Sequence, residues 1–435
     1  MNPNMITLSK LQESVINYPS DKMVVSLGVG LGKTIATLSA HKDVEKILII
    51  MPKMLKEEKT WEKNHEKLGS GSELYTISKE NFRKHHKTLP HFDCIVLDEY
   101  ASWAVGVSPT MRSKYGKEYI VSSQMHDAVM WYVKQHKPSK IYLVDATASA
   151  NKAMALWATK RILGTLSKID MDSFLAFRSI FYTKIQKGYR SIYLEKKDKK
   201  TTELLSKLWR ETGVFLDDVN RIPPIETVVD IEMTQEQRSI MQQLGQDYTD
   251  PMVLNLKQYM CLNGVYNTTQ FNEDKHKSIG VSQSIDNLKA KYIVDLVKKT
   301  KKQYIVFATF TTQIDCIVAE LKKVSIIAGS ITGKTEDKAK IAQMFRDEWI
   351  EVLVVQSSIC QGWEAPYCDA IIRASMPRRA DHAIQQAGRI DRPHIISKQN
   401  YIINLVIPKT VDEKAYKTIK KGEDLHWLTV DLENY

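Results

Sequence analysis

Short apolar runs alternate with longer amphipathic stretches along most of the chain. Apolar runs predict strands in the first half at Met23–Leu27, Lys46–Met51, Cys94–Leu97 and Lys140–Val144. In the second half they predict strands at Tyr304–Ala308, Val324–Ala328, Glu351–Val355, Ala370–Ala374 and Tyr401–Ile407. Helical stretches such as Ala128–Gln135 and Ala290–Lys299 lie between these runs, an order typical of parallel sheets. We therefore predict an α/β fold class with one mostly parallel, doubly wound sheet in each half.

The middle of the chain departs from this alternation. Residues 184–200 carry seven Lys or Arg and two acidic residues, with Tyr189 and Tyr193 among them. Such a stretch is either a solvated charged face or a contact with a nucleic-acid backbone. Pro223-Pro224 stops any helix, and Gln246–Ser284 is polar, so we expect it to be irregular. The predicted domains are 1–222 (with a basic insertion at about 184–200), a connector at 223–285, and 286–435.

Composition narrows the class of partner. The 435 residues include 62 Lys or Arg and 51 Asp or Glu, a net charge of +11 that favours an acidic partner such as nucleic acid, although a basic surface alone does not require one. With 18 Gly and 13 Pro the chain is neither collagen-like nor disordered. The five cysteines form no CxxC pair, so we expect no structural zinc or disulfide framework. No leader or membrane-spanning run is evident, and we expect a soluble, cytoplasmic protein.

A glycine-rich turn follows the first predicted strand. In Ser26–Thr34, SLGVGLGKT, glycines allow backbone N–H groups to approach phosphate oxygens at the start of a helix. Lys33 would reach the β- and γ-phosphates, and the Thr34 hydroxyl would bind Mg²⁺. The longer GxxxxGK[ST] pattern requires glycine at Leu27, so only the shorter GxGKT form is intact. The predicted nucleotide-binding loop comprises Leu27, Gly28, Val29, Gly30, Leu31, Gly32, Lys33 and Thr34.

Two further motifs follow apolar strands of the first half. In CIVLDEYA, Asp98 and Glu99 follow an apolar run that predicts a strand. They would therefore lie at the carboxyl edge of a sheet, where ligands bind in such folds. Asp98 would hold Mg²⁺ through water, and Glu99 would polarise the attacking water. The run Asp145–Ser149, DATAS, could relay between a nucleotide site and a nucleic-acid groove, although a simple helix cap is the alternative that we prefer from the residues alone.

The fourth motif lies in the second half, in Gln385–Pro393, QQAGRIDRP. Arg389 and Arg392 are three residues apart, so on a helix they share a face. Two guanidinium groups on one face suit a polyphosphate, as arginine fingers do.

Taken in order, GLGKT, LDEYA, DATAS and QQAGRIDR resemble the superfamily 2 helicases and translocases. Finer features are similar to the Swi/Snf-type branch: Met51–Leu55 followed by Trp61, Ile305–Phe310, Ile331–Lys334, and Val352–Gln356 with Gln361–Glu364. The resemblance covers about residues 5 to 420. The chain is similar to small bacteriophage-encoded DNA helicases in its short length, its lysine-rich composition and its DEYASW variant of the acidic motif.

The resemblance implies two tandem RecA-like lobes of the P-loop NTPase type, with ATP and Mg²⁺ as cofactors. Gln12 stands where the family reads adenine, and Glu364 and Gln385 would line the nucleotide cleft. Lys33, Glu99, Arg389 and Arg392 would be catalytic, with Thr34 and Asp98 at the metal. The groove for the DNA backbone would involve Lys53, Thr147, Thr311, Thr332 and Ser357.

Two positions depart from the family pattern. Tyr100 and Ala101 replace its usual small residue and histidine, and Trp363-Glu364 replaces a Leu-Asn pair. That histidine often links the metal site to the third motif, so the coupling here must follow another route.

By the same resemblance we expect a monomeric, ATP-dependent DNA helicase, a hydrolase of replication and recombination that acts on branched or forked DNA without sequence preference. Three alternatives remain: a double-strand translocase that remodels protein–DNA complexes without unwinding, an RNA helicase, and a DNA-binding clamp with an ATP switch.

Overall fold

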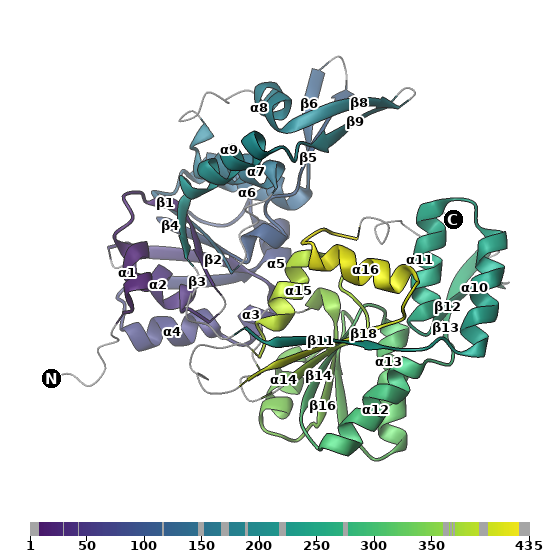
Figure 1. Ribbon diagram of the computed structural model, residues 1–435. Helices are drawn as coiled ribbons and strands as arrows, with labels where there is room; N and C mark the ends of the chain where they lie inside the picture. The colour runs from purple at the N-terminus through teal and green to yellow at the C-terminus, as the bar shows by residue number, and fades with distance from the viewer. Residues whose placement is uncertain are drawn as a thin grey trace. The chain divides into compact units, whose positions relative to one another are not determined.

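The computed structural model divides into two compact units, Met1–Val219 and Asn220–Tyr435, coloured from purple to teal and from teal to yellow in Figure 1. The described residues are 8–425, except for 29, 42, 115–116, 147–151, 167–173, 188–189, 217–222, 273–276, 360–364, 366–367, 369 and 391–398. Within these residues no helix is both long enough and apolar enough to cross a membrane.

The first unit is built on a six-stranded sheet in which all neighbouring strands are parallel. Its spatial order is β10 (Gly213–Leu216), β1 (Lys22–Leu27), β7 (Lys140–Asp145), β4 (Cys94–Asp98), β2 (Lys46–Met51) and β3 (Glu73–Ser78). All neighbours run the same way, so the ends of β1, β4 and β7 meet at one edge, where the loops after them can form a site.

Side chains alternate between the two faces of this sheet, as a strand period of two requires. Val24, Leu48 and Leu97 pack under α5 (Lys79–His85), α6 (Gln124–His136) and α7 (Ala153–Leu163). Their neighbours on the opposite face, such as Val25 and Ile49, pack under α1 (Lys10–Ile16), α2 (Lys33–Ser39) and α4 (Thr60–Leu68). Both faces are therefore buried, which explains why these strands are continuously apolar.

A second core in the same unit lies beneath two hairpins. It contains aromatic side chains such as Trp157, Phe177 and Trp209, from α7, α8 (Phe174–Phe181) and α9 (Lys199–Arg210). The hairpins are β5–β6 (Val107–Lys114, Lys117–Ser122) and β8–β9 (Tyr182–Lys187, Arg190–Glu195). The basic stretch 184–200 thus consists mainly of the second hairpin and the start of α9.

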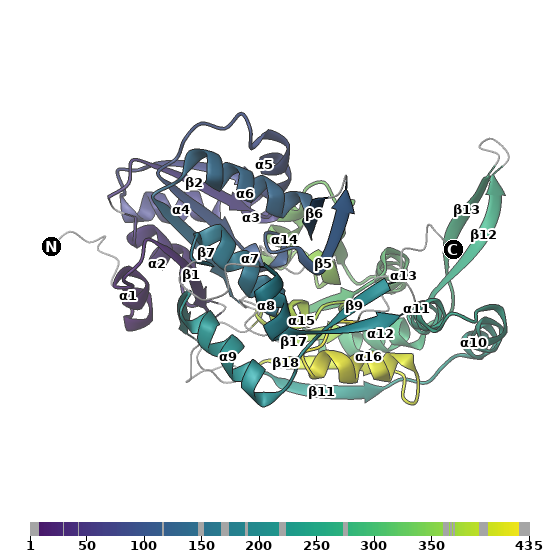
Figure 2. The same cartoon turned by 90° about the horizontal axis from the view of Figure 1, so that it is seen from above.

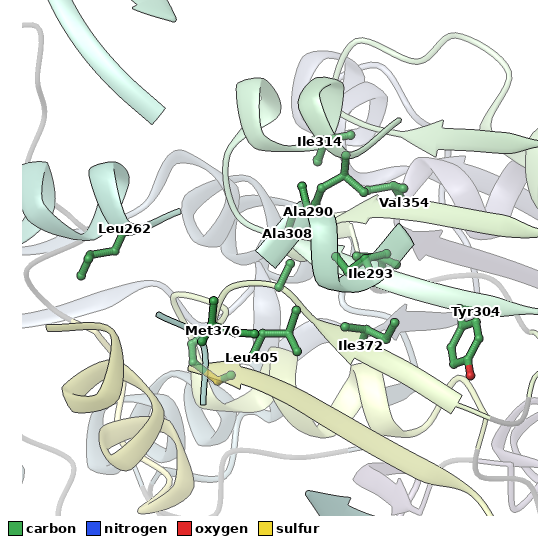
Figure 3. Packing of buried hydrophobic residues seen from close by; sticks show 14 of the residues in the cluster. Leu262, Ala290, Ile293, Tyr304, Ala308, Ile314, Val354, Ile372, Met376 and Leu405 are labelled. Atoms are coloured by element: carbon green, nitrogen blue, oxygen red, sulfur yellow. The ribbon is translucent and has the colours of Figure 1, made fainter. Parts of the chain in front are cut away.

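The second unit repeats the architecture with its own six-stranded parallel sheet. The order is β11 (Ile225–Asp230), β18 (Tyr401–Val406), β17 (Ala370–Arg373), β14 (Tyr304–Ala308), β16 (Val352–Gln356) and β15 (Ala328–Ile331). Figure 3 shows the core on one face of this sheet, where Ile372 and Val354 meet side chains of the covering helices. The helices around this sheet are α12 (Leu288–Thr300), α13 (Thr311–Lys323), α14 (Lys338–Arg346), α15 (Ala380–Ala387) and α16 (Val411–Lys420). The predicted α/β fold class is confirmed.

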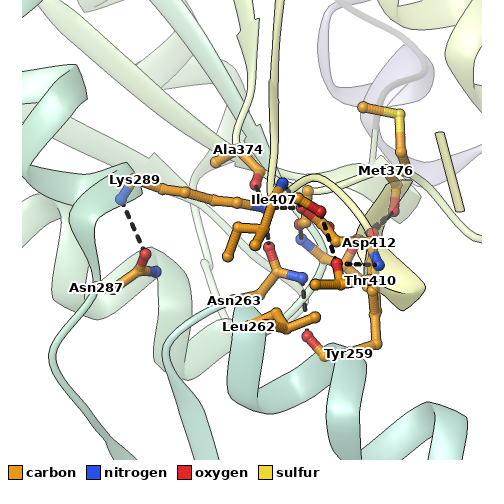
Figure 4. Close-up of polar contacts among 12 residues, drawn as sticks. Tyr259, Leu262, Asn263, Asn287, Lys289, Ala374, Met376, Ile407, Thr410 and Asp412 are labelled. Carbon is orange, nitrogen blue, oxygen red and sulfur yellow. Dashed lines mark hydrogen bonds and ion pairs between the residues drawn. The ribbon is translucent and has the colours of Figure 1, made fainter. Parts of the chain in front are cut away.

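A buried ion pair joins several elements of this second unit (Figure 4). Lys289, on α12, is fully buried and lies 2.7 Å from the Asp412 carboxylate, on α16. Its Nζ also donates to Asn263 Oδ1 and to the Ala374 carbonyl oxygen, both at 2.9 Å. Every polar atom of this lysine thus has a partner, which makes the burial of its charge tolerable.

The segment expected to be a connector belongs to the second unit, and its described residues include helices and strands. The prediction that Gln246–Ser284 is irregular is wrong, because it contains α11 (Pro251–Leu262) and the hairpin β12–β13 (Val265–Asn272, Lys277–Ser284). Helix α10 (Gln235–Asp247) packs beside α11, and Figure 2 shows the hairpin projecting from this pair. Strand β11 follows the prolines at 223–224 and forms the edge of the second sheet.

One predicted strand is displaced. Val324–Ala328 was expected to be extended, but Val324 caps α13 and Ser325 has a left-handed backbone with a φ of 62°. Ile327 is 58% exposed, and the strand β15 begins only at Ala328. The apolar run at 324–328 therefore ends α13 and forms a turn. The edge strand β15, which has mainly small residues, follows it.

Candidate nucleotide-binding site

The turn between β1 and α2 contains the predicted phosphate-binding loop. Gly30 and Gly32 have φ angles of 81° and 74°, a region that side-chain-bearing residues rarely adopt. Leu27 is fully buried in the core, so its side chain points away from the loop and this departure from the longer motif does not alter the turn. Helix α2 begins at Lys33, and its first N–H groups have no partner within the helix.

Gln12 lies against this loop. Ser9 and Gln12 form a capping box at the start of α1, with Gln12 Oε1 accepting from the Ser9 N–H at 2.9 Å. Its Nε2 donates to the Leu31 carbonyl oxygen at 3.3 Å. A Cβ at Gly32 would lie 2.2 Å from this Nε2, so Gln12 would have to shift, and the φ of 74° itself favours glycine there. The structure therefore brings Gln12 to the predicted nucleotide loop, 19 residues away along the chain.

Lys33 and Asp98 face the same region of the first unit. Lys33 Nζ donates to the carbonyl oxygens of Leu27 and Gly28 at 3.0 and 3.3 Å. The charge of Lys33 also lowers the pKa of Asp98, which places the ammonium group near the carboxylate at the end of β4. Thr34 is the second residue of α2, one position beyond Lys33.

Asp98 is held by donors on both carboxylate oxygens. Trp61 Nε1 donates to Oδ2 at 2.7 Å, and the Glu99 N–H donates to Oδ1 at 3.0 Å. Burial raises the pKa of Asp98 to about 6; the bond from Trp61 and the charge of Lys33 oppose this rise, and the charge of Asp145 adds to it. The sequence placed Trp61 near a family motif, but its contact with Asp98 is visible only in the structure.

Glu99 has an unusual backbone, with a φ of 52°, in the left-handed region. It is 8% exposed, and a 3₁₀ turn at Tyr100–Ser102 follows it. The Ser102 hydroxyl donates to the Glu99 carbonyl oxygen at 2.8 Å, which helps to fix this turn. Strained backbone of this kind persists where the surrounding structure specifies it, and it is concentrated at functional sites.

A backbone hydrogen bond joins the acidic motif to the end of β7. The Ala101 N–H donates to Asp145 Oδ2 at 3.1 Å, joining the turn after β4 to the end of β7. Asp145 is 1% exposed, so this bond is shielded from water. The first residue of DATAS thus contacts the acidic motif, whereas our preferred interpretation from sequence made this run a helix cap; Thr147 and the rest of the run lie outside the described residues.

The donor set fits Mg²⁺ and a nucleoside triphosphate. Thr34 and Asp98 offer hydroxyl and carboxylate oxygens, the ligands that Mg²⁺ prefers, and such sites usually complete the shell with phosphate and water. The buried carboxylate, whose ionised form burial disfavours, is one that a divalent cation would stabilise. A bound Mg²⁺ would supply neutralisation of phosphate charge. Lys33 would bind the terminal phosphates and Glu99 would orient water.

This arrangement predicts a pH dependence of ATP hydrolysis. Asp98 would hold a metal only in its ionised form. Because burial raises the pKa of Asp98 to about 6, kcat/KM should fall as pH decreases through 6, above the ordinary carboxylate range. Trp61→Phe removes a donor that favours the ionised form, so this acid limb should move to higher pH. A pH profile of kcat/KM measures it.

Trp103→Phe is the matched control, because the Trp103 indole donates to the backbone oxygen of Asp98 at 3.0 Å and not to its carboxylate. Its acid limb should coincide with that of the wild-type protein. Equal shifts in both variants would contradict a specific role for Trp61.

The predicted residues of the second unit lie around α15. Gln385 is 2% exposed within the helix, and Arg389, 5% exposed, follows its end at Ala387. The expectation that Arg389 lies on a helix is therefore wrong: Gly388 caps α15, and Arg389 Nε bends back to the Gln385 carbonyl oxygen at 3.0 Å. Arg373 holds the same helix by donating to the Ala383 carbonyl oxygen at 2.7 Å.

Val29, Thr147, Glu364 and Arg392 lie outside the described residues. The other groove candidates each follow the carboxyl end of a strand. In the first unit, Lys53 begins α3 (Lys53–Glu57) after β2. In the second unit, Thr311, Thr332 and Ser357 come after β14, β15 and β16, at one edge of the sheet. The Gly333 N–H donates to Gln356 Oε1 at 3.0 Å, which ties the last two of these loops together.

Comparison with known proteins supports the resemblance to superfamily 2 helicases. Residues 288–394 match the family model of the helicase conserved C-terminal domain. A variant of Dbp5 from S. cerevisiae, bound to RNA and ADP–BeF₃, aligns with 98% of this chain and 89% of its own, with a TM-score of 0.52 and 12% identity. The shared fold confirms two tandem RecA-like lobes. The SWI2/SNF2 ATPase core of Sulfolobus solfataricus, in complex with dsDNA, aligns with 96% of this chain and 91% of its own, with a TM-score of 0.39 and 15% identity.

Proposed function

We propose that this protein is an ATP-hydrolysing, monomeric DNA motor of the cytoplasm, similar to the Swi/Snf-type branch and to phage-encoded helicases. The observation that carries the proposal is the conjunction of Lys33, Asp98 and Glu99 at one edge of the first sheet with a matched helicase C-terminal domain. Its work would be branch migration and unwinding of branched or forked DNA in replication and recombination.

In this mechanism Lys33 and the two arginines of the second lobe, Arg389 and Arg392, hold the same γ-phosphate when ATP is bound. Hydrolysis removes that shared ligand and releases the lobes from each other. Each cycle changes the spacing of two backbone-binding surfaces, which moves the protein along a strand. The groove candidates Lys53, Thr147, Thr311, Thr332 and Ser357 would contact phosphates, so binding should be independent of sequence and sensitive to salt.

The experiment that tests the function is ATP hydrolysis without nucleic acid and with single-stranded DNA, duplex DNA, a four-way junction or RNA. Strongest stimulation by junction or forked DNA supports the proposal. Equal stimulation by plain duplex would favour a translocase that remodels complexes, and strongest stimulation by RNA would favour an RNA helicase. Absence of hydrolysis with every nucleic acid would leave only a clamp with an ATP switch.

The hairpin β8–β9 is our candidate for a strand-separating element. One of its faces carries Ile185, Ile192 and Leu194, exposed by 43, 42 and 52%. The other face packs on the second core, where Tyr193 lies under Arg178 at 4.3 Å. Changing the three exposed residues to serine should lower unwinding severalfold while basal ATP hydrolysis stays near the wild-type rate.

A strand-displacement assay run beside an ATPase assay measures this difference. Leu175→Ser is the control, because Leu175 is 49% exposed on the neighbouring helix α8 and not on the hairpin. Parallel losses of unwinding and ATP hydrolysis in the triple variant would contradict a role in strand separation.

A further inference from the structure

A hollow lies on the first unit, at the end of the sheet opposite to the predicted nucleotide loop. Its volume is about 400 Å³, within the usual range for small-molecule sites. It is lined by Lys22, the first residue of β1, and by residues of α6 and of the C-terminal end of α7, including Lys134 and Arg161. Because β1 begins at this hollow and ends at the phosphate loop, the two sites lie at opposite ends of the same strand.

Three cationic side chains line this hollow, and its lining contains no carboxylate. Within the described part of the chain, no hydrogen bond or ion pair joins the side-chain nitrogens of Lys22, Lys134 or Arg161 to another residue. The guanidinium carbon of Arg161 lies 5.2 Å from the centroid of the Trp157 ring, which positions this head group, and burial lowers the pKa of Arg161 against the opposing charge of Asp127. Positive charge is thus held at the hollow without a counter-charge in its wall.

Helix ends explain only part of this charge. Lys134 and Arg161 occupy the last turns of α6 and α7, where the helix dipole favours cations. Lys22 begins a strand and gains nothing from a helix dipole. The convergence of all three on one hollow therefore indicates an anionic ligand.

The rest of the wall is apolar and includes an aromatic ring. Met130, Trp131 and Leu163 line the hollow beside the cations. The Trp131 ring is held from its sides by His86, with ring centroids 5.3 Å apart, and by His136 at 6.2 Å. A positioned aromatic surface next to phosphate-binding cations is the combination that recognises a base and its phosphate.

We propose that this hollow binds a nucleoside phosphate, with its phosphate among Lys22, Lys134 and Arg161 and its base against the apolar wall. The same chemistry can come from a free nucleotide or from one nucleotide of a nucleic-acid strand. This site is separate from the ATP site, and it does not depend on ATP hydrolysis.

The probe that tests it is a fluorescent N-methylanthraniloyl derivative of adenosine monophosphate, followed by anisotropy with the full-length protein. A monophosphate lacks the β- and γ-phosphates that Lys33 is expected to hold, so Lys33→Ala should bind it as tightly as the wild-type protein does. Lys134→Glu should weaken binding about 10- to 100-fold, the effect of losing one charge-assisted contact. Because Lys134 is exposed, this variant should fold normally.

Lys67→Glu makes the same charge change at an exposed position of α4 and should bind the probe normally, since Lys67 does not line the hollow. Competition experiments then distinguish a free nucleotide from a nucleic-acid strand as the ligand. Displacement of the probe by unlabelled adenosine monophosphate but not by an oligonucleotide indicates a free nucleotide. Displacement by an oligonucleotide at far lower concentrations than adenosine monophosphate indicates a strand. Wild-type binding by Lys134→Glu, loss of binding in Lys33→Ala, or no binding to the wild-type protein would each overturn the proposal.

Discussion

Lys33→Ala should lower ATP hydrolysis by at least about 10²- to 10³-fold, the loss typical of removing one preorganised donor from a developing negative charge. The Lys33 ammonium group lies against the predicted phosphate loop and near Asp98, where it would contact the terminal phosphates. Two of its hydrogen bonds go to the backbone carbonyl oxygens of Leu27 and Gly28, and the strand β1 that ends there is held by its pairing with β10 and β7. The fold should therefore survive, and a colorimetric phosphate assay together with a thermal melt would measure both properties.

Lys79→Ala is a matched control for this change. Lys79 also begins a helix, α5, directly after a parallel strand of the same sheet, but no glycine-rich loop precedes it. Its ATP hydrolysis should remain within about twofold of the wild-type rate. Normal turnover by Lys33→Ala would sink the proposed mechanism, whereas a lowered melting temperature would mean that the activity loss reflects unfolding.

Lys289→Met should destabilise the second unit by about 3–5 kcal/mol, the usual effect of removing one partner from a buried ion pair. Asp412, 1% exposed, would keep its charge without the ammonium group that lies 2.7 Å away. Asn263 Oδ1 and the Ala374 carbonyl oxygen would also lose a donor. Urea unfolding followed by circular dichroism would measure the change.

Lys291→Met on the same helix tests whether burial decides this effect. Lys291 pairs with Asp286 at 2.8 Å, but both side chains are about half exposed, at 52 and 49%. Its loss should cost no more than about 0.5–1 kcal/mol. The pair Lys289→Met and Asp412→Asn should be more stable than Lys289→Met alone, since it removes the unpaired buried charge. Equal stability of Lys289→Met and Lys291→Met would contradict the role of the buried pair.

The central strands were predictable because their physical signal is strong. Lys46–Met51 and Tyr304–Ala308 were predicted with their observed bounds, and both are strands with a buried apolar run inside a parallel sheet. The glycine turn before Lys33 was predictable for a similar reason: the positive φ angles at Gly30 and Gly32 favour glycine locally. Patterns that depend on local sequence alone were therefore recovered.

What sequence could not reveal depends on contacts between distant segments or on short, polar elements. The bond from Trp61 to Asp98 joins residues 37 positions apart, and nothing in either motif specifies it. The edge strand β15, AGSI, lacks an apolar run. In β11 the residues are exposed or partly exposed, so its sequence resembles that of a loop. The end of α15 before Arg389 was missed because a glycine at position 388 was interpreted as part of the helix.

The bond from the Ala101 N–H to Asp145 has a consequence for the range of variants that this motif can tolerate. A histidine side chain in that role would be lost by most substitutions and would change its charge near neutral pH. A main-chain donor is present in every residue except proline. Position 101 should therefore accept many small side chains in a saturation library selected for activity, with proline depleted, while Asp145, as the acceptor, should remain intolerant.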